Sequence, residues 1–297
     1  MVLARGMPGG SVLGIIGGTG LYDLDGLTDQ KWVRVDSPFG APSDELLTGR
    51  LDDQQVVFLP RHGRGHRIPP HEINFLANID ALKRAGVTQV ISVSAVGSLR
   101  AELAPGTFVL VDQFIDRTLR KPKTFFGTGL VAHVSMAHPT CGRLVSQLAA
   151  VGGELGLQLV RGGTYVVMEG PQFSSLAESR MHIGLSADVI GMTNMPEAKL
   201  AREAELCYAT VAMVTDFDCW HPEHDHVKVS DVIAVMHANS DKAKKLLAAV
   251  IPRAGAYAGT CPSGCDRALE HALLTAPSAR DPEMVKRLSA VAGRVLA

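Results

Sequence analysis

The chain has 297 residues, of which 46% are hydrophobic and 20% are charged, and its formal net charge is -1. Such a chain can bury a full core, and without a basic surface it is not expected to bind nucleic acid or an anionic membrane. No apolar run approaches the roughly eighteen residues of a membrane span, and residues 1–10 lack the apolar core of a secretory signal. We therefore expect a cytoplasmic protein.

The cysteines do not form the pattern of a secreted disulfide framework, because they are odd in number and widely scattered. They are Cys141, Cys207, Cys219, Cys261 and Cys265. Free thiols are expected, although a local disulfide between Cys261 and Cys265 remains an alternative. Their Pro-Ser-Gly spacer is looser than that of a standard zinc knuckle, and the His221 to His226 segment lacks zinc-ligand spacing. No metal site is predicted.

Short β-branched runs alternate with longer helical patterns along the chain, which favours a largely parallel sheet with helices on both faces. Strands are predicted at Val12 to Ile16, Val56 to Leu59, Val87 to Val93, Phe108 to Ile115, Tyr165 to Met168, Asp188 to Gly191, and in the run ending near Asp216. Helices are predicted at His71 to Gly86, after Ser175, around Pro196, from Ser230 to about Leu247, and after Asp281. No internal repeat or linker divides the chain, so one domain over 1–297 is expected.

The first predicted strand ends in a glycine-rich turn, Gly17-Gly18-Thr19-Gly20. A dinucleotide fingerprint needs a third glycine three residues after Gly20, and Asp23 stands there. The turn can still offer backbone amides and the Thr19 hydroxyl to a phosphate. A purely structural glycine turn is the alternative.

The second predicted strand leads into a loop, Arg61 to Arg67, that contains three arginines and two histidines. Clustered guanidinium groups suit a dianion. His62 and His66 have the spacing of a zinc-binding helix, but Gly63 and Gly65 argue against a helix. The loop therefore indicates a phosphate site, with a solvated basic loop as the alternative.

Two acids, Asp216 and Asp218, follow the apolar run that begins at Val211. Residues two apart in a strand face the same side, so both carboxylates could reach one ligand edge. In open α/β sheets, ligands bind beyond the carboxyl ends of strands. A polar turn at the end of a strand is the alternative.

Six motifs occur in an order that resembles a known family. They are GGTG at 17–20, RHGRGH at 61–66, DQFIDRT at 112–118, EGPQFSS at 169–175, MTNMPE at 192–197 and TDFDCW at 215–220. Over residues 12 to 250 the chain resembles the trimeric purine nucleoside phosphorylase family, and within it the 5'-methylthioadenosine phosphorylase branch. The resemblance implies a three-layer α/β/α fold with a central mixed, largely parallel sheet, on which the C-terminal helices pack.

The resemblance also implies a role for particular residues. The family's phosphate site corresponds to Thr19, Arg61, His62, Ser94, Ala95 and Thr193. The purine stacks on Phe173, the sugar lies on Met192, and the base edge meets Asp216 and Asp218 as catalytic residues. The 5' substituent lies near His133, Val229 and Val232, in a region that a neighbouring subunit completes.

Family members that act on 6-oxopurines resemble one another in having Glu after the stacking Phe and Asn at the first acidic position, where this chain has Ser174 and Asp216. A carboxylate accepts hydrogen bonds from the amino group of adenine but repels a carbonyl oxygen. The expected reaction is phosphorolysis of S-methyl-5'-thioadenosine to adenine and 5-methylthioribose 1-phosphate. A 6-oxopurine nucleoside or methylthioinosine phosphorylase and a non-catalytic nucleoside-binding protein are the alternatives.

The expected partners are a small nucleoside and inorganic phosphate as co-substrate, with no cofactor, no nucleic acid and no membrane. The resemblance implies a homotrimer, and a hexamer is the alternative.

Overall fold

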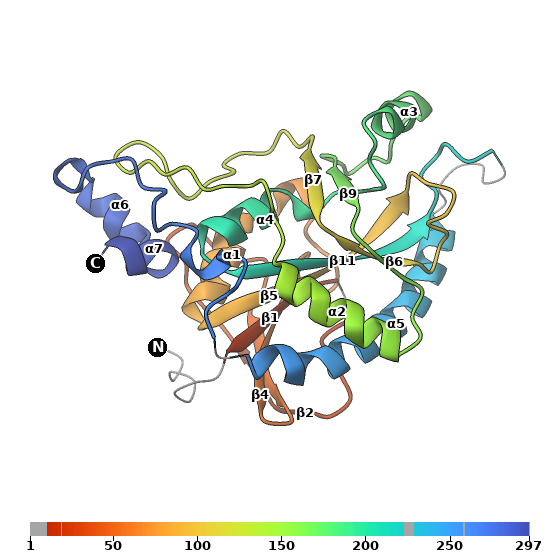
Figure 1. Ribbon diagram of the computed structural model, residues 1–297, viewed down its shortest axis with the longest axis horizontal. Helices are drawn as coiled ribbons and strands as arrows, with labels where there is room; N and C mark the ends of the chain where they lie inside the picture. Colours follow the sequence, from red (N-terminus) through yellow and green to blue (C-terminus); the bar gives the residue numbers. More distant parts are fainter. Residues whose placement is uncertain (1–10, 19, 223–228, 258, 297) are drawn as a thin grey trace.

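The structure, a computed structural model, describes residues 11–18, 20–222, 229–257 and 259–296, and the side chains of residues 229–232 are outside this description. Within the described part, an eleven-stranded sheet lies between two layers of helices (Figure 1). The sheet is mixed but largely parallel, so the predicted α/β/α fold is confirmed. No helix among these residues is both long enough and apolar enough to cross a membrane.

The strands follow one another as β2-β3-β4-β1-β5-β10-β9-β7, while β11 pairs with β5 and β6, and β6 pairs with β8. Their bounds are β1 Val12–Gly17, β2 Leu27–Val33, β3 Leu46–Leu51, β4 Gln54–Pro60, β5 Val87–Ser98, β6 Phe108–Val111, β7 Gln113–Asp116, β8 Leu159–Arg161, β9 Thr164–Val167, β10 Val189–Gly191 and β11 Cys207–Asp216.

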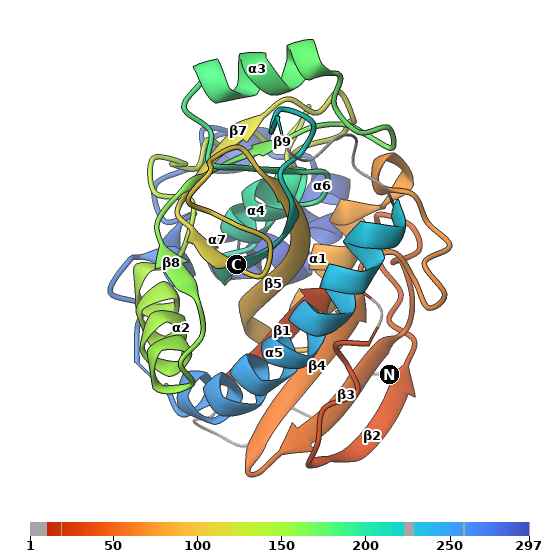
Figure 2. The same ribbon diagram turned by 90° about the vertical axis from the view of Figure 1, so that its right-hand side faces the viewer.

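Two helices cover one face of the sheet, α2 (Gly142–Glu154) and α5 (Val229–Gly255). The other face carries α1 (Phe75–Arg84) and α4 (Asn194–Glu203), and α7 (Ser289–Leu296) packs on α1 beside α6 (Pro282–Arg287). Short 3-10 turns occur at Pro70–Glu72, Cys265–Arg267 and Pro277–Ala279. Helix α3 (Leu176–Gly184) stands apart from the sheet (Figure 2).

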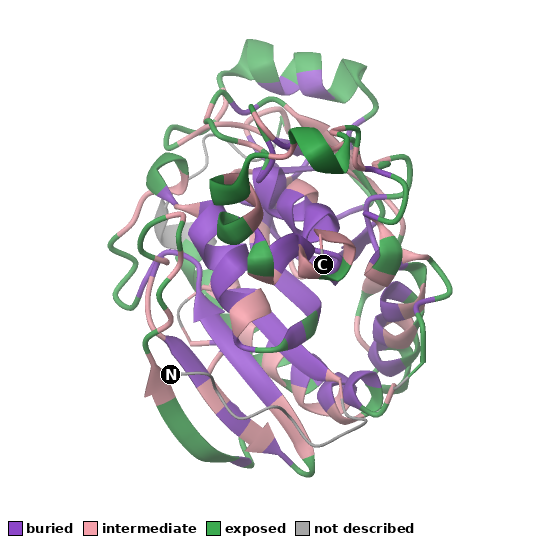
Figure 3. Ribbon diagram, turned by 90° about the vertical axis from the view of Figure 1, so that its left-hand side faces the viewer, coloured by how far each residue is buried: buried purple, intermediate pink, exposed green. Residues whose placement is uncertain are grey.

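The core forms two apolar layers, one on each face of the sheet, because strand side chains alternate. In β4, Val56 and Phe58 pack toward α2 and α5, whereas Val57 and Leu59 pack toward α1 and α4. The central strands are buried along their length, and α3 is mostly exposed (Figure 3).

Strands β5 and β11 run parallel at the centre of the sheet, in register from Gln89 opposite Cys207 to Gly97 opposite Asp216. Their carboxyl ends therefore meet at the same edge. The pairing of β11 with β5 is interrupted by a register shift between Val214 and Asp216, just before β11 ends. Asp216 lies at this edge opposite Gly97, while the predicted phosphate residues Ser94 and Ala95 lie further back in β5, opposite Ala212 and Met213.

The prediction of a single strand from Phe108 to Ile115 was wrong. Strand β6 pairs with β11 and β8, whereas β7 pairs with β9, and Asp112 separates them. The single residue between β6 and β7 allows the chain to pair with different strands on either side of it. The apolar pattern of a sequence does not show which strand will be its neighbour, so the two strands were predicted as one.

Two predicted helix bounds also differ from the structure. The helix expected from His71 begins at Phe75, because His71 belongs to a 3-10 turn and Asn74 caps α1 by accepting a hydrogen bond from the Ala77 backbone. The final helix expected after Asp281 is divided at Leu288 into α6 and α7. Strands β2, β3 and β8 were not predicted, since they are short or carry many polar residues.

Candidate active site

The two acids lie at the end of β11, but they come together differently from the prediction. The strand ends at Asp216, and Asp218 lies in the following turn with a φ of 52°. The Asp218 backbone N–H donates to Asp216 Oδ1 at 2.8 Å, and the Thr215 hydroxyl donates to Asp216 Oδ2 at 2.7 Å. A left-handed turn, rather than strand alternation, therefore brings the acids together.

The environments of these two acids differ. Burial raises the pKa of the Asp216 carboxyl, more than its hydrogen bonds from Thr215 and Asp218 lower it. The Asp218 side chain is buried, and its Oδ2 has no hydrogen-bond partner among the described residues. A buried acceptor without a partner is costly to maintain, so it is a ready contact for a ligand donor.

Gly97 at the end of β5 makes room for this pair. A Cβ atom at Gly97 would lie 2.9 Å from Asp216 Oδ1 and 3.3 Å from the Asp218 backbone nitrogen. Any side chain at position 97 would therefore displace the acids.

The hydroxyls of Ser94 and Thr193, two predicted phosphate residues, point at one atom. Ser94 Oγ donates to Asn194 Oδ1 at 3.1 Å, and Thr193 Oγ1 donates to the same oxygen at 3.3 Å. Asn194 is completely buried, and its amide donates to Tyr208 and Thr210. This shared acceptor holds the Thr193 hydroxyl, which follows β10, and the Ser94 hydroxyl within β5, next to the partly buried Ala95.

Arg61 is connected to these hydroxyls through Ser92, whose oxygen accepts from both Arg61 and Asn194, and the Arg61 residue is 1% exposed. Its Nε and Nη2 donate to the two carboxylate oxygens of Glu197 at 2.9 and 3.1 Å, and Nη1 donates to the Val93 carbonyl at 2.9 Å. Burial lowers the pKa of Arg61, but the Glu197 carboxylate raises it by more. The charge of Arg61 is therefore balanced within the protein.

The other two arginines of the loop are also bound to the protein. Arg64 pairs with Asp44 and Glu45, and Arg67 donates to the Ser43 carbonyl. Local acids and a backbone carbonyl therefore bind the guanidinium groups of Arg64 and Arg67.

His62 is mostly buried and stacks on His66, with the two ring centroids 4.2 Å apart. Burial and the Arg61 charge lower the pKa of His62 to about 4. His62 Nδ1 lies 2.9 Å from the Ile68 carbonyl, which can only accept, so Nδ1 carries the proton. The neutral ring then presents Nε2 as an acceptor.

The predicted base and sugar residues lie on the loops beyond the strand ends. Phe173 is 47% exposed, so its ring has an open face. The Ser174 carbonyl accepts from Cys219 Sγ at 3.3 Å, which ties its loop to the Asp218 turn. A Cβ atom at Gly170 would lie 2.4 Å from Met192 Sδ, so Met192 packs tightly on the same loop.

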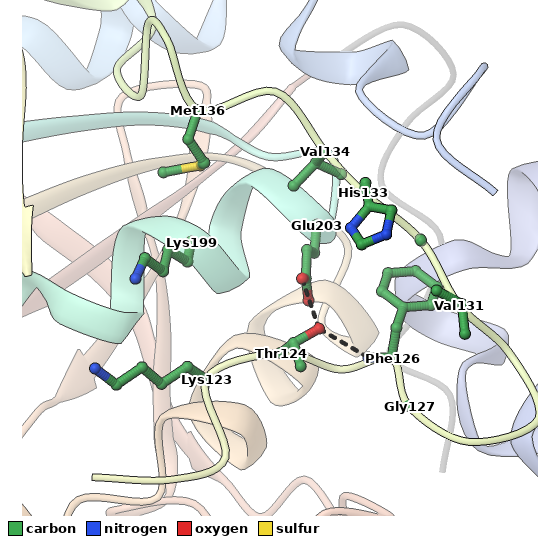
Figure 4. A pocket seen from close by; sticks show the side chains of 11 residues that line it. Lys123, Thr124, Phe126, Gly127, Val131, His133, Val134, Met136, Lys199 and Glu203 are labelled. Carbon is green, nitrogen blue, oxygen red and sulfur yellow. Dashed lines mark hydrogen bonds between the residues drawn. The ribbon is translucent and has the colours of Figure 1, made fainter. Parts of the chain in front are cut away.

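The structure does not bring His133 together with Asp216. His133 lines a separate pocket of about 370 Å³ together with Lys199 and Glu203 of α4, and Asp216 is not among the residues that line it (Figure 4). The ten residues of α4 span roughly 15 Å. Thr19 lies outside the described residues, as does most of the His221 to His226 segment, and Val229 and Val232 begin α5 with side chains that are not described.

The sequence analysis missed the buried residues that support the site, Asn194, Glu197 and Tyr208. Glu197 accepts from Arg61, from Ser92 at 2.6 Å and from Tyr208 at 2.9 Å. Two of them stand within the MTNMPE motif. Asn194 and Glu197 are polar residues at the buried start of a helix. Buried polar groups need hydrogen-bond partners, so their presence in this motif could have indicated a supporting role.

A mixed α/β/α sheet with hydroxyls and a buried acid pair at its strand ends defines a nucleoside phosphorylase class of enzyme. The chain belongs to the phosphorylase superfamily, whose family model matches residues 12–252. It is 58% identical over 286 residues to the S-methyl-5'-thioadenosine phosphorylase of Cereibacter sphaeroides, covering 96% of this chain and 99% of that protein. Its identity to the enzyme of the same name from Bradyrhizobium diazoefficiens is 60% over 286 residues, covering 96% and 98%.

Solved structures give the same result. A methylthioadenosine phosphorylase from an antarctic soil metagenomic library superposes with a TM-score of 0.90 at 44% identity, covering 95% of this chain and 99% of that chain. A Schistosoma mansoni methylthioadenosine phosphorylase in complex with adenine superposes with a TM-score of 0.80 at 35% identity, covering 91% and 99%. The resemblance stated from the six motifs is confirmed.

Proposed function

We propose that the chain catalyses phosphorolysis of S-methyl-5'-thioadenosine to adenine and 5-methylthioribose 1-phosphate. The similarity to proteins of that name supports the substrate. The observation that carries the proposal is the acid pair, in which the pKa of Asp216 is raised and Asp218 Oδ2 is buried with no hydrogen-bond partner in the part of the chain that the structure describes.

In the proposed reaction, a phosphate oxygen bonds to the anomeric carbon as the glycosidic C–N bond breaks. The bonding electrons leave with the purine, so the site has to stabilise negative charge on the base. Asp216 retains its proton to higher pH than an ordinary carboxyl, so it can donate to the purine N7 as the base departs.

Selectivity for adenine follows from Asp218. An ionised carboxylate only accepts hydrogen bonds, so its free oxygen suits an exocyclic amine and opposes a carbonyl oxygen. Ser174, which stands where 6-oxopurine enzymes of the family have Glu, supports the same choice. A mismatched buried polar group costs about 1 to 3 kcal/mol, which is enough for a clear preference.

Phosphate binding rests on Ser94, Thr193 and His62. The two hydroxyls donate to Asn194 and can turn to phosphate oxygens when phosphate enters. His62 Nε2, as an acceptor, favours a phosphate that carries a proton. The family resemblance also assigns Arg61, Ala95 and Thr19 to this site, and Arg61 supports it through Ser92, whose hydroxyl accepts from both Arg61 and Asn194.

We further propose a cytoplasmic homotrimer, with a hexamer as the alternative, that uses phosphate as co-substrate and no cofactor. The position of His133 supports this assembly, because His133 lies apart from Asp216 and could serve the 5' region of a neighbouring subunit. Val229 and Val232 would complete that region, with Phe173 on the base and Met192 beneath the sugar.

A substrate panel tests the proposal. The enzyme is incubated with methylthioadenosine, adenosine, methylthioinosine and inosine, each with and without phosphate, and released base is separated by chromatography. We expect phosphate-dependent release of adenine, fastest from methylthioadenosine. Faster release of hypoxanthine would favour a 6-oxopurine enzyme, and tight binding with no release of base would indicate a non-catalytic binding protein.

A further inference from the structure

Four of the five cysteines meet at a single buried point. The Sγ atoms of Cys141, Cys207, Cys261 and Cys265 all lie within 4.8 Å of one another, and each residue is at most 5% exposed. All are free thiols, so the local disulfide between Cys261 and Cys265 is absent. We propose that these four cysteines form a structural zinc site.

The cysteines come from three separate segments of the fold. Cys141 is the residue that precedes α2, and Cys207 begins β11. Cys261 and Cys265 lie in the loop after α5, and Cys265 begins a 3-10 turn. The site would therefore join the C-terminal loop to the central strand and to a surface helix.

The distances fit a tetrahedral metal. With zinc–sulfur bonds of about 2.3 Å, the sulfur atoms of a tetrahedral site are about 3.8 Å apart. Cys141 Sγ and Cys261 Sγ are 3.6 Å apart, and small side-chain movements would bring the others to similar separations. The two sulfur atoms of a disulfide are about 2.05 Å apart, and none of these four cysteines forms such a bond.

The local backbone is arranged as a ligand loop. Gly264 has a φ of 67° and donates its N–H to the Cys261 carbonyl at 2.9 Å, which folds the segment so that both cysteines face inward. The Cys261 N–H donates to Asp266 Oδ2 at 3.0 Å, which fixes the loop from the other side. A spacing of three residues between paired cysteines is within the range of zinc ligands.

The surroundings can compensate a negatively charged tetrathiolate. The first backbone amides of α2 lie next to Cys141, and the Leu144 amide is close to its sulfur. The Cys265 amide is close to the Cys261 sulfur. Such outer groups orient metal ligands and stabilise their charge.

No metal was predicted from the sequence, because Cys261 and Cys265 were judged as a pair and Cys141 and Cys207 lie far from them in the chain. Cys207 and Asp216 stand at opposite ends of β11, roughly 30 Å apart at the usual rise per residue, so the zinc would not take part in phosphorolysis. A closed site with four protein ligands contributes to folding and leaves no position for substrate.

The first experiment measures metal in the full-length protein, produced without chelator in zinc-supplemented medium, by elemental mass spectrometry. We expect about one zinc per chain, released by a mercurial reagent that titrates the thiols. Cobalt substitution should produce thiolate-to-cobalt charge-transfer bands. The variants Cys265→Ser and Cys261→Ser should lose the metal and melt at lower temperature.

The matched control is Cys219→Ser, since Cys219 lies at the other end of β11, outside the cluster. This variant should keep its zinc. If a serine variant fails to fold, the wild-type protein still decides the question through its metal content and its thiol count.

Three outcomes would overturn the proposal. One is wild-type protein that, after reduction and addition of zinc, remains metal-free with all thiols titratable. Another is a mass lowered by four hydrogens under non-reducing conditions, which would indicate two disulfides. The third is stoichiometric iron in place of zinc, since tetrahedral thiolate sites also suit iron.

Discussion

Arg61 and Glu197 form a bidentate ion pair in which each side chain is 2% exposed. The pair lies under the hydroxyls of the proposed phosphate site, and Glu197 also accepts from Ser92 and Tyr208. Because Arg61 is fully bound within the protein, its first contribution is to the stability of the site floor.

Arg61→Ala is expected to destabilise the fold by about 3 to 5 kcal/mol, because it leaves the Glu197 carboxylate buried and unpaired. The phosphate KM should rise as well, since Ser92 loses its Arg61 donor and Asn194, which holds the Ser94 and Thr193 hydroxyls, donates to the same Ser92 oxygen. Urea unfolding and phosphate titration measure the two effects. Arg64→Ala, which breaks a more exposed pair, is the control and should change stability far less. An unchanged unfolding free energy for Arg61→Ala would show that Glu197 finds another partner.

Asp216→Asn and Asp216→Ala should lower kcat by about 10²- to 10⁴-fold, the usual contribution of a general acid, while phosphate binding is retained. The raised pKa means that wild-type activity should fall as pH rises through that pKa and the carboxyl loses its proton. The pH profile of kcat/KM measures this fall in activity. The exposed Asp53→Asn serves as the control, and near-normal turnover by the Asp216 variants would refute the assignment.

Asp218→Asn is expected to weaken the discrimination between 6-amino and 6-oxo substrates. An amide can donate to a carbonyl oxygen, whereas an ionised carboxylate cannot. The ratio of kcat/KM for methylthioadenosine to that for methylthioinosine should fall by about tenfold, which corresponds to about 1.4 kcal/mol. The same ratio in both proteins would mean that Asp218 does not meet the base edge.

Gly97→Ala should reduce kcat, because the added Cβ would push Asp216 Oδ1 and the Asp218 backbone away from a distance of about 3 Å. Gly153→Ala in α2 is the matched control, since no atom lies within 4 Å of the Cβ position there. The control should keep its activity and gain about 0.5 to 1 kcal/mol of stability, as expected for alanine in a helix. Equal activity in the two variants would show that the acids tolerate displacement.

His62 should contribute to acid destabilisation of the fold. Its pKa is about 4 in the folded protein and 6.5 when unperturbed, so the unfolded state binds more protons between these values. The unfolding free energy should therefore fall as pH falls from about 6.5 to about 4. Denaturant titrations across this range should show a smaller slope for His62→Gln than for the wild-type protein. A wild-type slope in the His62 variant would contradict the buried, neutral imidazole.

The sequence by itself determined the fold class and most of the candidate site. Buried strands such as β1 and β4 are continuous apolar runs, and their short spacing to helical patterns is visible without a structure. The strand-end motifs containing Ser94, Thr193 and Asp216 could be located in the same way. Local composition carries these signals because each depends on a few neighbouring residues.

Only the tertiary structure decided how distant residues meet. The partners of Arg61 and the shared acceptor Asn194 depend on contacts between separate segments. The cysteine cluster is the clearest case, since Cys141 and Cys261 are far apart in the chain and 3.6 Å apart in the fold. Sheet order and packing set these contacts, and neither is encoded in the periodicity of any single segment.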